Sequence, residues 1–551
     1  MSERRLVTLA LFVATFLVAL DTSVVSTAMP TVIGQIGGIH LYAWVFSAYL
    51  LSSTVSMPIY GKLADLFGRK PVLLTGTALF LGGSMLCGQS QTMEQLIAFR
   101  LLQGLGAGGM LPITQTILGD IFPLEQRARI TGLFSTVWGV SGLLGPGVGG
   151  FLTEYVSWRW VFYVNFPLCV LSMLLISRFL HEHIQRRRHS IDYLGAAALS
   201  ASVALLLLGL QSTGNQLQQV VLYGVAVALI PVFVWQERRA AEPLVPLWLF
   251  GRRAIGVSTL GGVLMGFALY GQSTFLPPFV QGVMGATPTV SGFVLATSSL
   301  SWPAASTIGG RLLLRWGFRG PCILGGIFLV IGFALLLLLT PESGLWMPAA
   351  VECVLGFGFG FYTVTTVLAA QTAVGWEHRG VVTSASQFAR NIGGTVGVSI
   401  AGAIFTAGVA AAAGAGINPN ELLSPATRAS LATGDLAFLQ SLLAGALRSV
   451  YVLFIGMAIL ATAIAAFLPG GPPRQESDAG PGPTVNRPAG RGAAVDGSPE
   501  TSVAGAAWTG DVMALAPAIA ARGLTQPGAD RDAPGRRGGR VRRAHTGRRG
   551  L

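Results

Sequence analysis

Residues 61–70, Gly-Lys-Leu-Ala-Asp-Leu-Phe-Gly-Arg-Lys, decide how this chain folds. They are charged, and they separate two apolar segments, 41–60 and 71–89, that are each long enough to cross a bilayer as a helix. Because only this short loop joins the segments, we expect them to form adjacent antiparallel helices. Gly61 and Gly68 allow positive φ angles and close backbone approach, which a tight loop requires.

The charges of this stretch indicate more than a plain connection. Asp65 can hold a helix N-terminus or a basic partner at the membrane surface. Arg69 and Lys70 suit the cytoplasmic face of a membrane. An ordinary hairpin needs turn residues and a cation, but it does not need Gly, Asp, Gly and Arg-Lys in this order, so we interpret the stretch as functional.

Composition identifies the class of protein. The chain has 551 residues, of which 52% are hydrophobic and 11% are charged, and its mean hydropathy is +0.62. A soluble globular protein carries about 25% charged residues, so this is an integral membrane protein. The net charge of +13 does not indicate nucleic-acid binding, because the basic residues lie between apolar segments and in the C-terminal tail rather than on one face.

Enzymatic chemistry has no support in the sequence. The four cysteines fall inside apolar segments without metal-ligand spacing, and we interpret them as small buried hydrophobic residues. The sequence holds no nucleotide-binding loop and no nucleophile with a matching base. We therefore expect a protein that is not an enzyme, with no metal and no cofactor.

Fourteen segments contain the roughly 20 apolar residues that a membrane-spanning helix needs. They are 6–28, 41–60, 71–89, 95–118, 131–153, 160–180, 192–211, 219–236, 254–280, 289–310, 319–340, 346–370, 381–408 and 449–468.

The distribution of charge predicts the topology of these spans. With the N-terminus inside, nineteen Arg and Lys residues fall in inner segments and three in outer segments, before the tail is counted. This asymmetry follows the positive-inside rule and places both termini in the cytoplasm. The segment 409–448 is the one sizeable outer connection, with room for a short helix. Residues 469–551 are rich in Gly, Pro, Ala and Arg, which predicts a disordered cytoplasmic tail.

Two charged residues lie inside otherwise apolar spans, where ionised side chains are costly and usually functional. Counting 1.5 Å per residue from the outer ends of their spans, Asp21 lies about 10 Å deep and Arg100 about 9 Å deep. At one level in the same half of the protein, they can pair and lower each other's burial penalty. Two interpretations stay open: proton coupling, in which movement of Arg100 or arrival of a cation changes the protonation of Asp21, and a static pair that fixes helix packing.

Several of these stretches resemble motifs of the major facilitator superfamily of transporters. Residues 61–70 are similar to its Gly-x-Leu-x-Asp-Arg-x-Gly-Arg-Lys motif, with Leu66 where the family usually has Arg. Residues 96–107 resemble the span-four motif, whose arginine is implicated in proton transfer. The surroundings of Asp21 resemble the first span of the fourteen-helix drug:proton antiporters, with Ser26 where that family usually has Asn.

The fifth span carries a row of small residues, Gly145-Pro146-x-x-Gly149-Gly150. Small residues spaced four apart let another helix approach closely, and the proline permits a kink. The row resembles the antiporter motif of the superfamily, with Ser141 at the expected first glycine. A general packing stripe is the alternative.

Other stretches extend the resemblance. Residues 119–129 and 158–167 match signatures of the fourteen-helix subgroup, and 310–319 look like a degenerate second copy of the opening motif. Such repetition is expected if two six-helix halves share ancestry.

The resemblance also implies roles for residues near the cytoplasm and in the cavity. It implies that Asp65 engages the inner end of the span 381–408, so that Arg390 joins a gating set. That set is Gly61, Asp65, Gly68, Arg69, Lys70 and Arg390. Five polar residues within spans are our candidates for substrate binding: Gln103, Gln115, Tyr270, Gln272 and Glu352.

We therefore predict an all-α polytopic protein with the major facilitator fold. It has an N-terminal six-helix bundle (1–190), two inserted helices (191–253), a C-terminal six-helix bundle (254–468) and the tail (469–551). The expected function is proton-coupled antiport that exports hydrophobic or cationic drugs across a bacterial inner membrane. We expect a monomer whose partners are such small molecules, protons and membrane lipid, and not nucleic acid.

Three alternatives remain open from the sequence. An exporter of lipid or of a secondary metabolite could use the same scaffold. A uniporter or an uptake symporter would accumulate its substrate inside the cell. A membrane receptor or scaffold would use the tail as an interaction module.

Overall fold

A computed structural model of the chain describes residues 3–470 except 123, 182–191, 212–215, 241–250, 376–378, 415–418, 424–427 and 429–432. All of these residues belong to one compact unit, Met1–Asp478. The predicted disordered tail, 469–551, therefore lies almost wholly outside the described residues.

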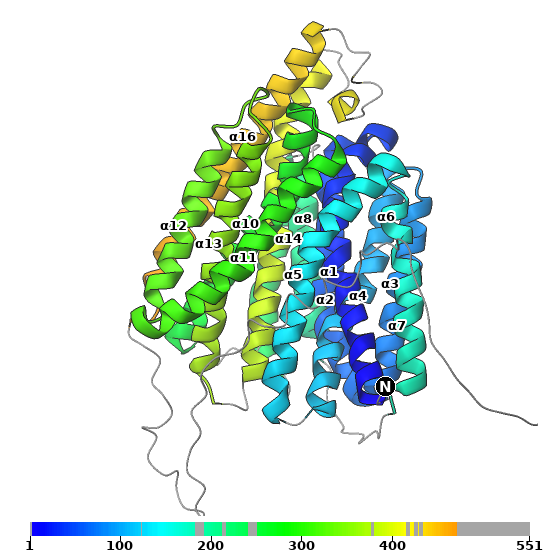
Figure 1. Ribbon diagram of the computed structural model, residues 1–551, viewed down its shortest axis with the longest axis vertical. Helices are drawn as coiled ribbons and strands as arrows, with labels where there is room; N and C mark the ends of the chain where they lie inside the picture. The colour runs from blue at the N-terminus through cyan, green and yellow to red at the C-terminus, as the bar shows by residue number, and fades with distance from the viewer. Residues whose placement is uncertain are drawn as a thin grey trace, which may run out of the picture. The chain divides into compact units, whose positions relative to one another are not determined.

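The described residues form a succession of helices (Figure 1). They are α1 (Glu3–Ile36), η1 (Ile39–Leu41), α2 (Tyr42–Phe67), α3 (Arg69–Gln89), α4 (Met93–Ile121), α5 (Leu124–Tyr155), α6 (Trp160–Tyr163), α7 (Asn165–Phe179), α8 (Tyr193–Gln211), α9 (Gln216–Arg239), α10 (Arg253–Pro278), η3 (Phe279–Val283), α11 (Pro288–Trp316), α12 (Arg319–Leu336), α13 (Trp346–Thr372), α14 (Arg379–Gly414), η5 (Pro419–Leu423) and α16 (Thr433–Ala465).

The predicted spans coincide with these helices. Each of the fourteen segments overlaps a helix, and the segment 160–180 is divided between the short α6 and the longer α7. Within the described residues, ten helical segments are long and apolar enough to cross a membrane. The positions of the helices are therefore confirmed, whereas the number of fourteen crossings stays a prediction.

The stretch 61–70 is more helical than we expected. Helix α2 continues to Phe67 and α3 begins at Arg69, so the predicted loop is reduced to a turn at Gly68. Gly68 has a φ of 95°, which confirms its turn role. The expectation for Gly61 was wrong: it lies within α2, and a side chain there would meet nothing within 4 Å.

The outer segment 409–448 is also more helical than predicted. Helix α14 runs on to Gly414, and α16 begins at Thr433 rather than at residue 449. The short helix η5 between them confirms the helix for which this segment had room. The boundaries were wrong because hydropathy detects only the part of a helix immersed in lipid, whereas backbone hydrogen bonds continue the helix into water.

The helices pack as two sets joined along two seams (Figure 1). In the first set α1 packs on α5 and α7, and α4 packs on α2 and α3. In the second set α10 packs on α14, α13 packs on α11 and α12, and α12 packs on α16. The sets meet where α5 contacts α11 and where α2 contacts α14, while α8 and α9 pack on each other and α8 reaches α2 and α14.

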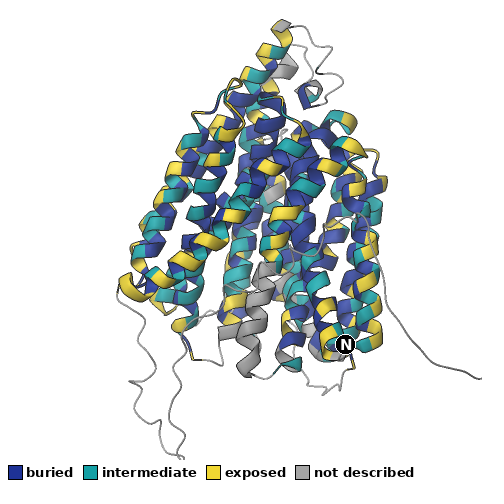
Figure 2. Ribbon diagram, viewed as in Figure 1, coloured by how far each residue is buried: buried dark blue, intermediate teal, exposed yellow. Residues whose placement is uncertain are grey.

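The outer surface of the helices is apolar. Figure 2 shows buried residues on the facing sides of the helices and many exposed residues on their outer sides. Large hydrophobic side chains such as Leu217 and Trp346 are 68% and 75% exposed. In the most apolar part of α9 only 6% of residues are buried. An apolar surface of this extent suits lipid rather than water.

Candidate functional site

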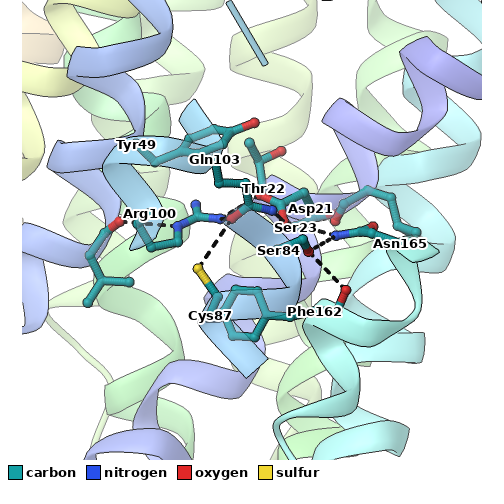
Figure 3. A network of polar contacts seen from close by, with 12 residues as sticks. Asp21, Thr22, Ser23, Tyr49, Ser84, Cys87, Arg100, Gln103, Phe162 and Asn165 are labelled. Carbon is teal, nitrogen blue, oxygen red and sulfur yellow. Dashed lines mark hydrogen bonds and ion pairs between the residues drawn. The ribbon is translucent and has the colours of Figure 1, made fainter. Parts of the chain in front are cut away.

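Asp21 and Arg100 form a buried ion pair. Arg100 Nη1 lies 2.6 Å from Asp21 Oδ2, and the two side chains are 1% and 0% exposed (Figure 3). The predicted pairing of Asp21 with Arg100 is therefore confirmed, and the two charges come from α1 and α4. Complete burial makes each charge dependent on the other, since an unpaired ion at this position would be strongly penalised.

The carboxylate of Asp21 accepts two further hydrogen bonds. Its Oδ1 accepts one from Gln103 Nε2 at 2.7 Å and one from Asn165 Nδ2 at 3.3 Å. Gln103 also accepts a bond from Arg100 Nη1 at 2.8 Å through its own Oε1. Gln103, which we considered for substrate binding, thus belongs to the ion-pair network, one turn along α4 from Arg100.

Helices α3 and α7 complete the network. Asn165 Nδ2 donates to Ser84 Oγ at 3.0 Å, and Ser84 Oγ donates to the carbonyl of Phe162 at 2.9 Å (Figure 3). Cys87 Sγ lies 3.7 Å from Gln103 Oε1. Sequence reasoning did not assign Ser84 or Asn165 to the site. One indication was present in the sequence: Asn165 lies in the stretch 158–167, which resembles a signature of the fourteen-helix subgroup.

Arg100 has partners besides the carboxylate. Its Cζ lies 4.0 Å from the centre of the Tyr49 ring on α2, a cation–π contact. Its Nε donates to the carbonyl of Val45 at 3.4 Å. The guanidinium is therefore held by α1, α2 and α4 together. The Tyr49 hydroxyl is buried and has no hydrogen-bond partner among the described residues.

A second polar group lies in the other set of helices, around Arg390. Arg390 donates to Gln387 Oε1, and Gln387 Nε2 donates to Asn391 Oδ1 at 3.0 Å. Tyr270 Oη on α10 donates to the same Asn391 oxygen at 3.3 Å. Arg390, Gln387 and Thr363 also line a cavity of about 50 Å³ between α10, α13 and α14.

The predicted contact between Asp65 and the inner end of α14 cannot be followed here, since the side chain of Asp65 lies outside the described residues. Lys70 Nζ donates to the carbonyl of Ser177 at 2.8 Å, which ties the start of α3 to α7. Arg69 is half-buried at the first position of α3.

Two of the substrate-binding candidates come together. Gln272 Nε2 on α10 donates to Glu352 Oε1 on α13, and both side chains are buried. Tyr270 lies two residues from Gln272 but bonds to α14 instead. Gln115 is exposed, and it lies twelve residues from Gln103, about 18 Å along α4, so it joins neither group.

The row of small residues in α5 faces two helices. Cβ atoms built at Gly145 and Gly149 would collide with α1, the latter 2.9 Å from Val24 Cα. A Cβ at Gly150 would lie 2.6 Å from Thr289 Cα on α11. The predicted close approach is therefore present, and α5 is in tight contact with both its own set of helices and the other one. The role of Pro146 and of this row in antiport stays a prediction.

Six hydrogen bonds between described residues join the two sets of helices. We call the end that carries η1 the outer end and the end at Gly68 the inner end, following the predicted topology. All six bonds lie toward the outer end, so that this side is closed. Their partners are Thr27–Gln281, Ile39–Asn420, His40–Thr406, Tyr42–Thr274, Ser47–Ser399 and Glu154–Thr289.

The fold recurs in solved transporter structures. The chain superposes with a TM-score of 0.62 on a bacterial homologue of the human lysosomal transporter Spinster, in an inward-facing and unoccupied conformation, at 17% identity over 85% of this chain and 97% of that one. A D-xylose–proton symporter gives a TM-score of 0.58 at 14% identity, covering 85% of this chain and 98% of that chain. At these identities the likeness shows the fold alone.

Sequence relatives are closer. The chain is 36% identical over 411 residues to the multidrug transporter protein MdtP of Bacillus subtilis (strain 168), covering 74% of this chain and 76% of that protein. It is 33% identical over 495 residues to multidrug resistance protein 3 of the same organism, covering 84% and 97%. The profile of the Major Facilitator Superfamily matches residues 11–398. With that match across most of its helices, this chain belongs to the Major Facilitator Superfamily of membrane transporters.

Proposed function

We propose that this protein exports hydrophobic, cationic small molecules across the cell membrane in exchange for protons, and that the carboxyl group of Asp21 carries the proton. The observation on which the proposal depends is the network around Asp21, in which one buried carboxylate is held by a guanidinium and two amides. The names of the multidrug relatives support the class of substrate.

The network is better suited to a switch than to a static pair. When a proton binds to Asp21 Oδ2, the ion pair with Arg100 is lost. Arg100 still keeps Gln103 Oε1, the Val45 carbonyl and the face of Tyr49. These remaining partners lower the free-energy cost of protonating Asp21, because they stabilise the buried positive charge of Arg100 after its counter-ion is neutralised.

Gln103 links the two charges through one side chain. Its amide nitrogen donates to Asp21 and its amide oxygen accepts from Arg100. Protonation of Asp21 removes the negative charge that holds the amide nitrogen, so Arg100 and Gln103 can shift together. A change of one proton at α1 is thereby transmitted to α4 and, through Tyr49, to α2.

Tyr49 and Tyr270 are suited to receive the cation. They come from the two different sets of helices, Tyr49 from α2 beside Arg100 and Tyr270 from α10 beside Asn391. Aromatic faces attract cationic groups, most strongly in a site that excludes water. A cationic substrate near Tyr49 stabilises the ionised carboxylate of Asp21, as Arg100 does. Binding of the substrate therefore favours release of the proton from Asp21.

Alternating access provides the transport step. In this proposal substrate enters from the inner end, because the outer end is closed by hydrogen bonds between the two sets. Outer protons reach Asp21 after these bonds break and the sets rock about the substrate. We keep the division into an N-terminal bundle (1–190), inserted helices (191–253) and a C-terminal bundle (254–468) as part of this proposal, with both termini in the cytoplasm.

The test is transport by Asp21→Asn in inside-out membrane vesicles with an imposed pH gradient. Asparagine has nearly the same shape but cannot carry a proton, so we expect transport against a gradient to be lost. Asp435→Asn is the matched control, because Asp435 is exposed at the start of α16. Transport by Asp21→Asn at the wild-type rate and gradient would remove Asp21 from the mechanism.

A further inference from the structure

Helices α4 and α13 repeat one pattern of glycines in the two halves of the protein. In each helix three glycines alternate with other residues, at 104, 106 and 108 in α4 and at 356, 358 and 360 in α13. Their surroundings repeat as well. A Cβ at Gly104 would meet the carbonyl of Tyr49 on α2 at 2.5 Å, and a Cβ at Gly356 would meet the carbonyl of Ser298 on α11 at 2.6 Å.

This register makes Glu352 the counterpart of Arg100. Each lies four residues before the first glycine of its helix. Arg100 lies beside Tyr49, and Glu352 lies beside Ser298, the residue that corresponds to Tyr49. Across from Arg100 is Asp21 on α1, and across from Glu352 is Gln272 on α10. The second half therefore repeats the buried pair with an acid in the position of the arginine and a neutral amide in the position of the aspartate.

Glu352 is consequently a buried acid without a compensating cation. Its side chain is 0% exposed, and Oε1 accepts from Gln272. Oε2 has no hydrogen-bond partner among the described residues, because the hydroxyl of the neighbouring Ser298 donates to the Leu295 carbonyl at 2.8 Å instead. The titratable group that interacts with it from another packed helix is Tyr451 of α16, whose hydroxyl donates to the Phe275 carbonyl at 3.3 Å. Within the described part of the chain no Arg, Lys or His lies within ion-pair distance of it. An ionised carboxylate is strongly disfavoured in such a site unless a cation or water compensates its charge.

The helix that positions Gln272 also takes part in closing the outer end. Two residues beyond Gln272, the carbonyl of Thr274 accepts from Tyr42 Oη, and further along Gln281 Nε2 donates to the carbonyl of Thr27 at 2.8 Å. Opening of the outer end breaks both bonds along α10. The same movement gives water a route to Glu352, which lies near the outer end of α13.

We propose that Glu352 is a second proton-carrying carboxyl group, so that each transport cycle moves two protons, one on Asp21 and one on Glu352. This inference depends on the proposed proton-coupled export. In the outward-open state the carboxylate of Glu352 takes a proton from outer water. In the inward-open state its O–H bond breaks as a cationic substrate approaches the free Oε2, and the proton passes to cytoplasmic water.

The charge balance distinguishes two protons from one. Two protons entering for one monovalent cation leaving carry one net positive charge into the cell, so the membrane potential drives export. With Asp21 alone, one proton exchanges for one monovalent cation and the potential has no effect on the final gradient. The buried acid Glu352 is thus the feature that makes export of a monocation sensitive to voltage.

The experiment measures the steady-state accumulation of ethidium, a permanent monocation, in inside-out vesicles at a fixed pH gradient. A lumen-positive potential of about 60 mV is imposed with potassium and valinomycin. For one net charge this potential multiplies the ethidium ratio about tenfold. We expect the wild type to show this tenfold increase and Glu352→Gln to show none. The variant should reach a lower ethidium ratio that depends on the pH gradient alone, because one proton drives it instead of two. Glu342→Gln, at an exposed loop position, is the matched control and should behave as wild type.

The outcomes separate this inference from the proposed function. A tenfold response that persists in Glu352→Gln overturns the inference, and so does a wild type that uses the pH gradient but not the potential. A wild type that fails to accumulate ethidium under the pH gradient contradicts the proposed function itself. A folded Glu352→Gln, monodisperse by size-exclusion chromatography, that still binds ethidium but does not transport it also overturns the inference, because Asp21 alone should then drive transport. If Glu352→Gln aggregates, Glu352→Met replaces it in the same assay. If both variants aggregate, a wild type that shows no tenfold response to the potential still overturns the inference.

Discussion

The ion pair between Asp21 and Arg100 offers a quantitative test of the site. We consider Arg100→Leu, Asp21→Asn and the double variant as a thermodynamic cycle. Each single change leaves one buried group without its opposite charge, whereas the double variant removes both charges. The double variant should therefore lose less stability than the sum of the losses in the two single variants.

The contacts set the size of the effect. Arg100→Leu removes the 2.6 Å charge-assisted hydrogen bond to Asp21, which contributes about 1.5–3 kcal/mol. It also removes the cation–π contact with Tyr49, which contributes about 0.5–2 kcal/mol. The sum of about 2–5 kcal/mol agrees with the cost of about 3–5 kcal/mol for breaking a buried pair from one side. We expect the coupling energy of the cycle to be about 3 kcal/mol.

The assay is the free energy of unfolding from titration with sodium dodecyl sulfate in mixed micelles. Arg100→Leu combined with Glu342→Gln serves as the control cycle and should be additive, because Glu342 is exposed in a loop and shares no partner with Arg100. If the double variant Asp21→Asn/Arg100→Leu loses the sum of the two single losses within about 0.5 kcal/mol, the charges do not stabilise each other and the reasoning is refuted.

Three further predictions concern the conformational cycle and the tail. Asp65→Ala should slow turnover but leave the affinity for substrate unchanged, and weaker binding with normal turnover would contradict a gating role. Cysteines at positions 47 and 399, where the two hydroxyls lie 2.8 Å apart across the outer seam, should form a disulfide that stops transport until it is reduced; transport at the normal rate in the oxidised protein would show that this seam does not open. Removal of 469–551 should leave transport in vesicles unchanged, and its loss would favour an interaction role for the tail.

Several elements could be predicted from the sequence because they depend on local properties. A helix in lipid must satisfy its own backbone hydrogen bonds, so each sufficiently long apolar segment predicts a helix. The pairing of Asp21 with Arg100 was predicted from the rise of two helices counted from the ends of their apolar segments, although α1 itself continues beyond its segment to Ile36. Apolar segments do not mark the ends of helices. The predicted boundaries of α2, α14 and α16 were wrong because these helices continue beyond their apolar segments.

Most of the site's other partners could not be predicted. Asn165 and Ser84 contact the network only because α7 and α3 turn these faces toward α1. In a membrane protein the lipid and the protein interior are both apolar, so the sequence contains little signal for the rotation of a helix about its axis. The resemblance placed Asn165 in a motif, but it did not say what Asn165 contacts.

By itself, then, the sequence determined the helices, their apolar character, the family motifs and the pairing of the two buried charges. The tertiary structure alone decided which polar groups surround Asp21, that Gln272 meets Glu352, and that the bonds between described residues of the two sets lie toward the outer end. The physical reason is that backbone hydrogen bonding and transfer into lipid act on consecutive residues. Contacts between helices, in contrast, depend on how side chains far apart in the chain fit against one another.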